Sequence, residues 1–197
     1  MLYSFFRLIL ILLLKSFFRF EVEGRQFLPK KGGFILASNH VSYLDPIAAG
    51  VACPRKLNFM AKDSLFSNSF LFWFFNTLGA FPVKRNSIDT SAMKEAIARL
   101  NNGKVLLIFP EGSRQVGGFS ATARRGIGFI AVKSNLPVIP AFIKGTDSVL
   151  PKGSKFIRPG AIKVYFGREI SIERSESHNY QAIADKIMRS IGHLACT

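Results

Sequence analysis

Residues 103–114 read GKVLLIFPEGSR, and this stretch decides the fold. The apolar run 105–109 has the length and composition of a buried β-strand. Glu111 and Arg114 follow it closely, at the carboxyl edge of the predicted sheet, where open α/β sheets bind ligands. Gly112 permits a tight turn, and the guanidinium of Arg114 offers paired donors that suit a phosphate. Taken alone, the stretch is explained equally well as a surface ion pair in a turn.

From about residue 33, the chain alternates short apolar runs with helical patterns. Helix 90–101 has Asp89 or Thr90 as its expected N-cap. The alternation predicts a single layered α/β domain over residues 21–197, with a mixed, mostly parallel central sheet flanked by helices. The predicted strands are 34–38, 57–61, 81–84, 105–109, 138–143 and 161–166, and the predicted helices are 46–53, 64–78, 90–101, 121–135 and 177–195.

The first 20 residues read MLYSFFRLILILLLKSFFRF. Their unbroken apolar run, 8–14, is too short for a membrane span, which needs about 20 residues. At 100° per residue, four polar side chains share one narrow face of a helix and the rest is Leu, Ile and Phe; the four are Ser4, Arg7, Lys15 and Arg19. We therefore expect residues 1–20 to form an amphipathic helix at a membrane interface, its basic residues toward the phosphates. The alternative is an N-terminal helix that packs on the domain.

Composition and net charge indicate which classes of binding partner the protein can have. The 197 residues include 27 Lys or Arg against 12 Asp or Glu, a net charge of +15, and 20 Phe. A protein with this positive charge is expected to bind nucleic acid, an anionic membrane or phosphorylated substrates. No nucleic-acid-binding signature accompanies the charge, while the run FLFWFF at 70–75 favours a lipid-facing surface. Cys53 and Cys196 have no spacing that indicates a disulfide framework or a zinc site.

A second polar stretch, SNHVSYLDP at 38–46, directly follows a predicted strand. His40 and Asp45 are five residues apart, so on one regular helix or strand they would point apart. They can meet only if the chain changes structure between them. Asp45 as a helix N-cap, with Pro46 at the first helical position, supplies that change. Separately, each residue also has a structural explanation, a helix start for Asp45 and an ordinary loop histidine for His40.

Two further stretches are GAFPVKR at 79–85 and LPVIPA at 136–141. By itself, the first is a strand that ends in the basic pair Lys84 and Arg85, and the second is a strand entered by proline. In this order and spacing, the four stretches together resemble the glycerolipid acyltransferase family of lysophosphatidic acid acyltransferases. That family is marked by N-H-x-x-x-x-D, a G-x-F-x-x-R-like block, F-P-E-G-[ST]-R and V-I-P. The resemblance runs from about Phe34 to Phe142, and more weakly to Ile170.

The resemblance implies transfer of a fatty acyl group from an acyl thioester, on coenzyme A or acyl carrier protein, to the free sn-2 hydroxyl of 1-acylglycerol-3-phosphate, which gives phosphatidic acid. It implies no cofactor beyond the thioester co-substrate and no metal. His40 and Asp45 would be the catalytic dyad. The implied substrate-binding residues are Lys84, Arg85 and Arg114 for the phosphate, and Glu111, with its neighbours Gly112 and Ser113, for the glycerol part.

The chemistry of the residues agrees with these roles. A lipid hydroxyl needs a base, and histidine, with an ordinary pKa of about 6.5, suits that task near neutrality. The leaving thiolate needs no strong acid, and no G-x-S-x-G nucleophile motif is present. The sequence therefore favours direct transfer without an acyl-enzyme intermediate.

Two other functions remain open from the sequence. One is acyl transfer to a different lysolipid, such as a lyso-aminolipid, and the other is a non-catalytic basic protein that binds membranes or nucleic acid. We expect lysophospholipid, acyl thioester and anionic membrane as partners, acyl carrier protein as a possible one, and no nucleic acid. Basic residues near the N-terminus favour peripheral or monotopic attachment to the cytoplasmic face of the cell membrane.

Overall fold

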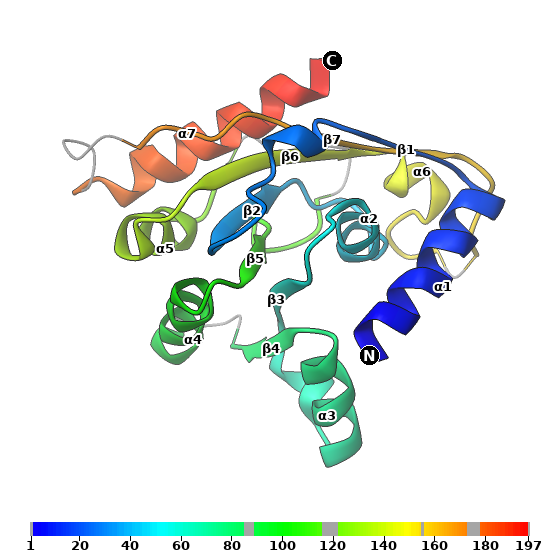
Figure 1. The fold of residues 1–197 in the computed structure, drawn as a ribbon, viewed down its shortest axis with the longest axis horizontal. Helices are drawn as coiled ribbons and strands as arrows, with labels where there is room; N and C mark the ends of the chain where they lie inside the picture. Colours follow the sequence, from blue (N-terminus) through cyan, green and yellow to red (C-terminus); the bar gives the residue numbers. More distant parts are fainter. Residues whose placement is uncertain (1, 85–88, 116–121, 155, 173–177, 197) are drawn as a thin grey trace.

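The computed structural model describes residues 2–84, 89–115, 122–154, 156–172 and 178–196. Its centre is a seven-stranded sheet in the order β1-β7-β6-β2-β5-β3-β4 (Figure 1). Neighbouring strands pair in parallel except β6 and β7, which are antiparallel. The predicted mixed, mostly parallel sheet is thus confirmed. The strands are β1 Arg19–Glu23, β2 Phe34–Ser38, β3 Leu57–Lys62, β4 Ala80–Val83, β5 Val105–Ile108, β6 Val138–Lys144 and β7 Ala161–Phe166.

Helices cover both faces of the sheet and make three layers (Figure 1). The helices α1 (Leu2–Phe17), α2 (Asp45–Ala52) and α6 (Thr146–Val149) lie on one face. The other face is covered by α4 (Thr90–Asn101), α5 (Gly126–Ser134) and α7 (Tyr180–His193). A seventh helix, α3 (Ser69–Thr77), lies beyond the β4 edge, next to the 3-10 turn η2 (Asp63–Phe66). Two further 3-10 turns are η1 (Arg25–Phe27) and η4 (Leu194–Cys196).

One strand, β1, was missed in the sequence, and it shortens the expected helix 1–20. The helix α1 ends at Phe17, and Arg19 begins β1. Phe20 and Val22 are partly buried between exposed charged residues, so the alternation of a half-buried strand is present but short. The partner is β7, more than 140 residues along the chain, with Arg19 beside Ala161. Because that pairing is so remote, local helical periodicity gave no sign of it.

Helix boundaries also differ from the prediction, most clearly in the two helices described next, and α6 was not predicted. The single helix expected at 64–78 is η2 followed by α3, because the side chain of Asn68 accepts a hydrogen bond from the backbone N–H of Leu71 (2.8 Å) and starts a new helix. The helix expected at 121–135 begins only at Gly126. Asp89 is the N-cap of α4, as one of the two predicted caps.

The helix α1 packs on the domain and also presents an apolar outer face. On its inner side Leu14 is buried. Arg7 turns inward as well, and its guanidinium donates to the carbonyl oxygens of Gly50, Val51 and Cys53 (2.9–3.1 Å). The predicted orientation of Arg7 toward lipid phosphates is therefore wrong, because the negative C-terminal end of α2 attracts its charge. The exposed outer side chains of α1 are Phe5, Leu8, Ile9, Leu12, Leu13 and Phe17. Among the described residues, no helix has the length and apolar character needed to cross a bilayer.

The parallel pairing brings five strand ends to one edge of the sheet. The strands β4, β3, β5, β2 and β6 run in the same direction, so their carboxyl ends share this edge. His40 comes two residues after β2, Glu111 three after β5, Thr146 two after β6 and Lys84 one after β4. The sheet topology therefore gathers chain segments that are far apart in the sequence.

Candidate active site

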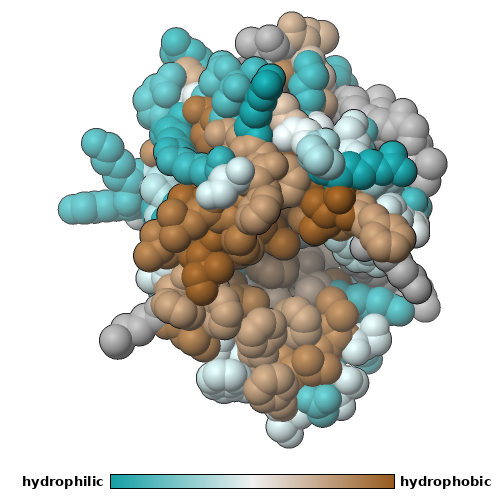
Figure 2. All heavy atoms as spheres, turned by 90° about the vertical axis from the view of Figure 1, so that its right-hand side faces the viewer, coloured by the Kyte–Doolittle hydropathy of each residue, from teal (hydrophilic) through white to brown (hydrophobic). Residues whose placement is uncertain are grey.

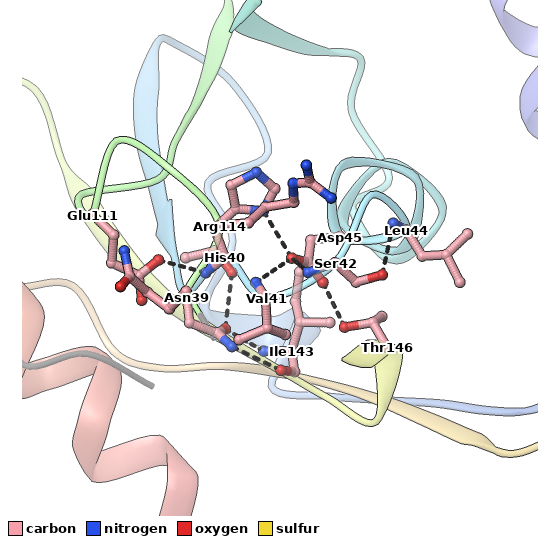
Figure 3. A network of polar contacts seen from close by, with 12 residues as sticks. Asn39, His40, Val41, Ser42, Leu44, Asp45, Glu111, Arg114, Ile143 and Thr146 are labelled. Atoms are coloured by element: carbon pink, nitrogen blue, oxygen red, sulfur yellow. Dashed lines mark hydrogen bonds and ion pairs between the residues drawn. The ribbon is translucent and has the colours of Figure 1, made fainter. Parts of the chain in front are cut away.

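The carboxylate of Asp45 is the centre of the polar network in Figure 3. It is fully buried. Its Oδ2 accepts hydrogen bonds from the backbone N–H of Val41 and of Ser42 (both 2.7 Å) and lies 2.8 Å from Nδ1 of His40. The predicted meeting of His40 and Asp45 is thus observed. Asp45 is not the N-cap, however: it is the first residue of α2, with Leu44 as N-cap, and its carboxylate turns back to the preceding loop.

Thr146 completes this network, and sequence reasoning missed it. Its Oγ1 donates to Oδ1 of Asp45 at 2.5 Å, and the residue is fully buried. Three certain donors thus surround the Asp45 carboxylate, and His40 Nδ1 would be a fourth. A buried carboxylate held by so many donors is stabilised as an anion. The signal that could have found Thr146 is its position, three residues after the predicted strand 138–143 at the same sheet edge.

Three contacts hold His40 in place, one made by its ring and two by its backbone. Its ring stacks on Phe109, with ring centroids 4.1 Å apart and planes 17° apart. The backbone N–H of His40 donates to Oε2 of Glu111 (2.7 Å), and its carbonyl oxygen accepts from the backbone N–H of Gln115 (2.9 Å). The side chain is only 12% exposed. With Nδ1 at Asp45, Nε2 is the nitrogen that can meet a substrate.

Asn39 ties this loop to the neighbouring strand, and it too was missed. Its side chain exchanges two hydrogen bonds with the backbone of Ile143 in β6: Oδ1 accepts from the N–H (2.7 Å), and Nδ2 donates to the carbonyl oxygen (2.9 Å). The backbone pairing of β2 with β6 ends at Ser38, and the Asn39 side chain supplies the next two hydrogen bonds to β6. This fixes the point from which the loop to His40 departs.

The segment after β5 lies against the His40 loop. Glu111 is buried and contacts the His40 backbone as described. Gly112 has φ +73°, and a Cβ there would stand 2.3 Å from Nε of Arg124, so the turn requires glycine. Ser113 is exposed. The expectation that Glu111, Gly112 and Ser113 bind the glycerol part of the acceptor stays a prediction.

The predicted phosphate-binding cations are not all in one place. The guanidinium of Arg114 stacks on the ring of Tyr43, 3.4 Å from its centroid, beside the His40–Asp45 loop. Lys84 is exposed after β4, three strands from β2. Spacings of about 4.8 Å per strand put those two strand ends about 14 Å apart. Arg85 lies outside the described residues.

Two more lysines, Lys62 and Lys144, end β3 and β6 at the same edge and are exposed. With Arg114, Arg124 and Lys84, they line the carboxyl edge of the sheet at which the dyad lies, and this set is called the cationic rim. Within the described ranges, no three His, Cys, Asp or Glu side chains are grouped as metal ligands.

Known proteins are similar to this chain in sequence and in fold. Residues 19–144, which include His40, Asp45 and Arg114, match the family model described as Acyltransferase. The chain belongs to this acyltransferase family. A 1-acyl-sn-glycerol-3-phosphate acyltransferase of Bacillus subtilis is 31% identical over 76% of this chain and 73% of its own length. A chloroplastic one of Arabidopsis thaliana is 27% identical over 78% of this chain but only 44% of its own length.

A solved structure has the same fold as this acyltransferase. The crystal structure of the 1-acyl-sn-glycerophosphate acyltransferase PlsC from Thermotoga maritima matches with a TM-score of 0.74 and 26% identity, over 99% of this chain and 82% of that one. The expected fold class and family are therefore confirmed. The chain is an enzyme of acyl transfer.

Proposed function

We propose that this acyltransferase moves a fatty acyl group from an acyl thioester to the free sn-2 hydroxyl of 1-acylglycerol-3-phosphate, giving phosphatidic acid. The observation that carries the proposal is the buried Asp45 carboxylate held against His40 beside the cationic rim. The names of the Bacillus subtilis and Thermotoga maritima relatives, both acyltransferases of 1-acyl-sn-glycerol phosphate, support the acceptor. Coenzyme A and acyl carrier protein both remain candidate donors.

In the proposed reaction, His40 is the general base. Nε2 takes the proton from the acceptor hydroxyl while that oxygen attacks the thioester carbonyl carbon. Asp45 keeps Nδ1 protonated and stabilises the imidazolium that forms. The tetrahedral intermediate then collapses, the C–S bond breaks, and the leaving thiolate takes up a proton from the imidazolium or from water. A thiol with a pKa of about 8.5 leaves readily, so a single base suffices.

The cationic rim is suited to the acceptor's phosphate. Arg114 lies beside the dyad loop, and its stacking on Tyr43 leaves the edge of the guanidinium available to oxygen acceptors. Lys84 would approach the phosphate from the β4 side, and Arg85, outside the described residues, is proposed as a further phosphate-binding cation. A glycerol phosphate placed between these cations keeps its hydroxyl near His40.

An apolar cavity close to Asp45 suits a segment of an acyl chain. It has a volume of about 110 Å³, lies between α1, α2 and β3, and is lined chiefly by apolar side chains. Pro46 and Ile47, directly after Asp45, are among its lining residues, as are Phe6 and Leu10 of α1. Figure 2 shows a hollow on this side of the molecule, between the apolar surfaces of α1 and α3.

We further propose that the enzyme sits on the anionic cytoplasmic face of the membrane as a peripheral or monotopic protein. Figure 2 shows apolar side chains gathered on one face, over α1 and α3. The two helices touch through Phe6 and Phe74, whose rings meet edge to face at 6.0 Å. Trp73 and Phe70 of α3 are exposed there, a composition typical of the lipid–water interface.

The decisive experiment compares H40A with the unsubstituted enzyme by mass spectrometry of the products. Acyl-CoA and acylated acyl carrier protein are each offered as donor, with lysophosphatidic acid and with a lyso-aminolipid that lacks phosphate as acceptors. We expect H40A to lose at least about 100-fold in rate, since it removes the base. The matched control is H193A, which alters an exposed histidine at the end of α7 and should keep full activity.

Retention of most activity by H40A would exclude the dyad mechanism. Preference for the lyso-aminolipid would support acyl transfer to that acceptor instead. Binding to vesicles without any product, unaffected by H40A, would support the non-catalytic alternative.

A further inference from the structure

Two apolar side chains between α6 and β7 are unusually exposed. Phe156 is 81% exposed and Ile157 is 59% exposed, and Phe156 is the most exposed large hydrophobic side chain of the described residues. The backbone around them is held in a turn, because the hydroxyl of Ser154 donates to the carbonyl oxygen of Phe156 and accepts from its N–H (3.0 and 3.1 Å). Two adjacent apolar side chains held outward in this way point to an interaction surface.

This pair, Phe156 and Ile157, is called the apolar tip here, and it lies near the C-terminal end of α1. Its base is closed by a hydrogen bond from the N–H of Arg158 to the carbonyl oxygen of Val149 (2.8 Å). Two residues further on, the carbonyl oxygen of Gly160 accepts from the N–H of Arg19, directly after α1 (3.2 Å). In Figure 1 this segment, in yellow, leads from α6 to β7, which pairs with β1, the strand that follows α1.

The surroundings of the apolar tip are basic. Lys152 and Arg158 flank it on the chain, and both are exposed. The described residues 150–154 and 156–158 include no acid. An apolar tip between cations matches a bilayer surface with anionic headgroups, which takes the rings into its acyl boundary and the charges at its phosphates.

We propose that the apolar tip inserts into the same bilayer surface as α1 and α3 and is the third point of attachment. This inference rests on the membrane association proposed above. The helices α1 and α3 adjoin at Phe6 and Phe74, so two contacts alone would let the molecule roll about the line that joins them. A third contact off that line fixes the tilt of the protein on the membrane.

The segment that precedes the tip is hydrogen-bonded to the loops that carry the active site. The hydroxyl of Ser42, in the His40–Asp45 loop, donates to the carbonyl oxygen of Leu150 (2.8 Å). The ammonium of Lys152 donates to the carbonyl oxygen of Arg114 (3.3 Å). The depth of the tip in the bilayer therefore sets the depth of the dyad, so that a lysolipid can reach Nε2 without leaving the membrane.

The test places a fluorescent probe at the tip. Trp73 is the one tryptophan of the chain, so F156W in a W73F background reports on the tip alone. Vesicles of phosphatidylcholine with about a third phosphatidylglycerol should shift its emission to the blue and allow quenching by brominated acyl chains. The matched control is H193W in the same background, on the opposite face of the sheet, which should stay unquenched.

Function is tested with F156S/I157S. We expect vesicle binding about 10-fold weaker, because two apolar side chains no longer enter the bilayer. Activity on lysolipid in vesicles should fall, while activity on a water-soluble short-chain lysolipid should be unchanged. The conservative variant F156L/I157V should behave like the unsubstituted enzyme.

Each contrary result has its own meaning. If the protein binds vesicles but the tryptophan at the tip stays in water, the tip does not insert and this inference is wrong, while the proposed membrane association stands. If the unsubstituted protein fails to bind vesicles, both fail. If F156S/I157S changes only the sedimentation behaviour, the tip is a contact between copies of the chain and the inference is wrong.

Discussion

At the scale of single residues, the geometry of the site depends on the hydrogen bonds that one buried carboxylate accepts. Asp45 faces donors from the loop between β2 and α2 and from α6, and all of these donor residues are buried. Each hydrogen bond to such an anion contributes about 1.5–3 kcal/mol. When one donor is removed, the carboxylate shifts toward the donors that remain, and its position relative to His40 changes. The orientation of His40 therefore depends on residues that never meet substrate.

Thr146 gives the sharpest test of this dependence. T146V keeps the branched shape but removes the hydroxyl that donates to Oδ1 of Asp45. We expect kcat to fall about 10-fold with little change in KM, since one charge-assisted hydrogen bond is lost and the imidazole is less well held. T146S should restore kcat, measured by steady-state kinetics. Loss of thermal stability in T146V with no change in kcat would show a purely structural role.

At the scale of an element, the start of α4 is fixed by one partly exposed carboxylate. Asp89 Oδ1 accepts from the N–H of Ala92, and Oδ2 accepts from the N–H of Lys84 (both 2.9 Å). These backbone hydrogen bonds, that of Lys84 first, lower the pKa of Asp89 below its ordinary value. The same side chain therefore caps the helix and holds the chain that follows β4, where the predicted phosphate-binding Lys84 lies.

Asp89 predicts a pH dependence of stability. Because its pKa is depressed in the folded state, its stabilisation is present above the unfolded pKa and is lost as pH falls through the folded pKa. D89A should lower the free energy of unfolding by about 1 kcal/mol at neutral pH. D89N keeps an oxygen acceptor but cannot titrate. The difference in urea midpoint between D89N and the unsubstituted protein should shrink as the pH falls below about 4; a constant difference would contradict the prediction.

At the scale of the whole molecule, charge and apolar surface act together. The net charge is +15, and the exposed apolar side chains of α1 and α3 share one face (Figure 2). The charge attracts the protein to an anionic surface over several ångströms, while the apolar side chains hold it only on contact. The two contributions therefore respond differently to salt.

The electrostatic and the apolar contributions to membrane binding can be separated by varying the salt concentration in a co-sedimentation assay. Raising the salt from about 0.05 M to about 0.5 M shortens the Debye length from roughly 14 Å to roughly 4 Å. Binding to vesicles with phosphatidylglycerol should weaken markedly, whereas binding to pure phosphatidylcholine, which depends on apolar burial, should change little. Equal salt dependence on both vesicles would show that the apolar face does not contact the lipid.

Much of the molecule could be predicted because its signals are local. The strands β2, β5 and β6 are short apolar runs bounded by glycine, proline or polar residues, and their parallel order places His40 and Glu111 at one edge. The change from loop to helix at Asp45 likewise depends on neighbouring residues. These features follow from hydrophobic periodicity and backbone preference, which a few residues suffice to express.

Other features depend on partners that are distant in the sequence. The pairing of β1 with β7 is one of them. The inward turn of Arg7, toward carbonyl groups more than 40 residues away, is another. Thr146 reaches Asp45 across 101 positions, and Asn39 reaches Ile143 across 104. No window along the chain contains both members of such a pair.

The order of amino acids alone thus determined the layered α/β class, the edge at which the polar residues gather and the identity of the His40–Asp45 pair. Only the tertiary structure decided which groups surround that pair, which side of α1 faces outward, and that Phe156 and Ile157 stand near that helix. The physical reason is that periodicity is a property of neighbouring residues, whereas the satisfaction of a buried charge and the exposure of an apolar side chain depend on everything packed around them.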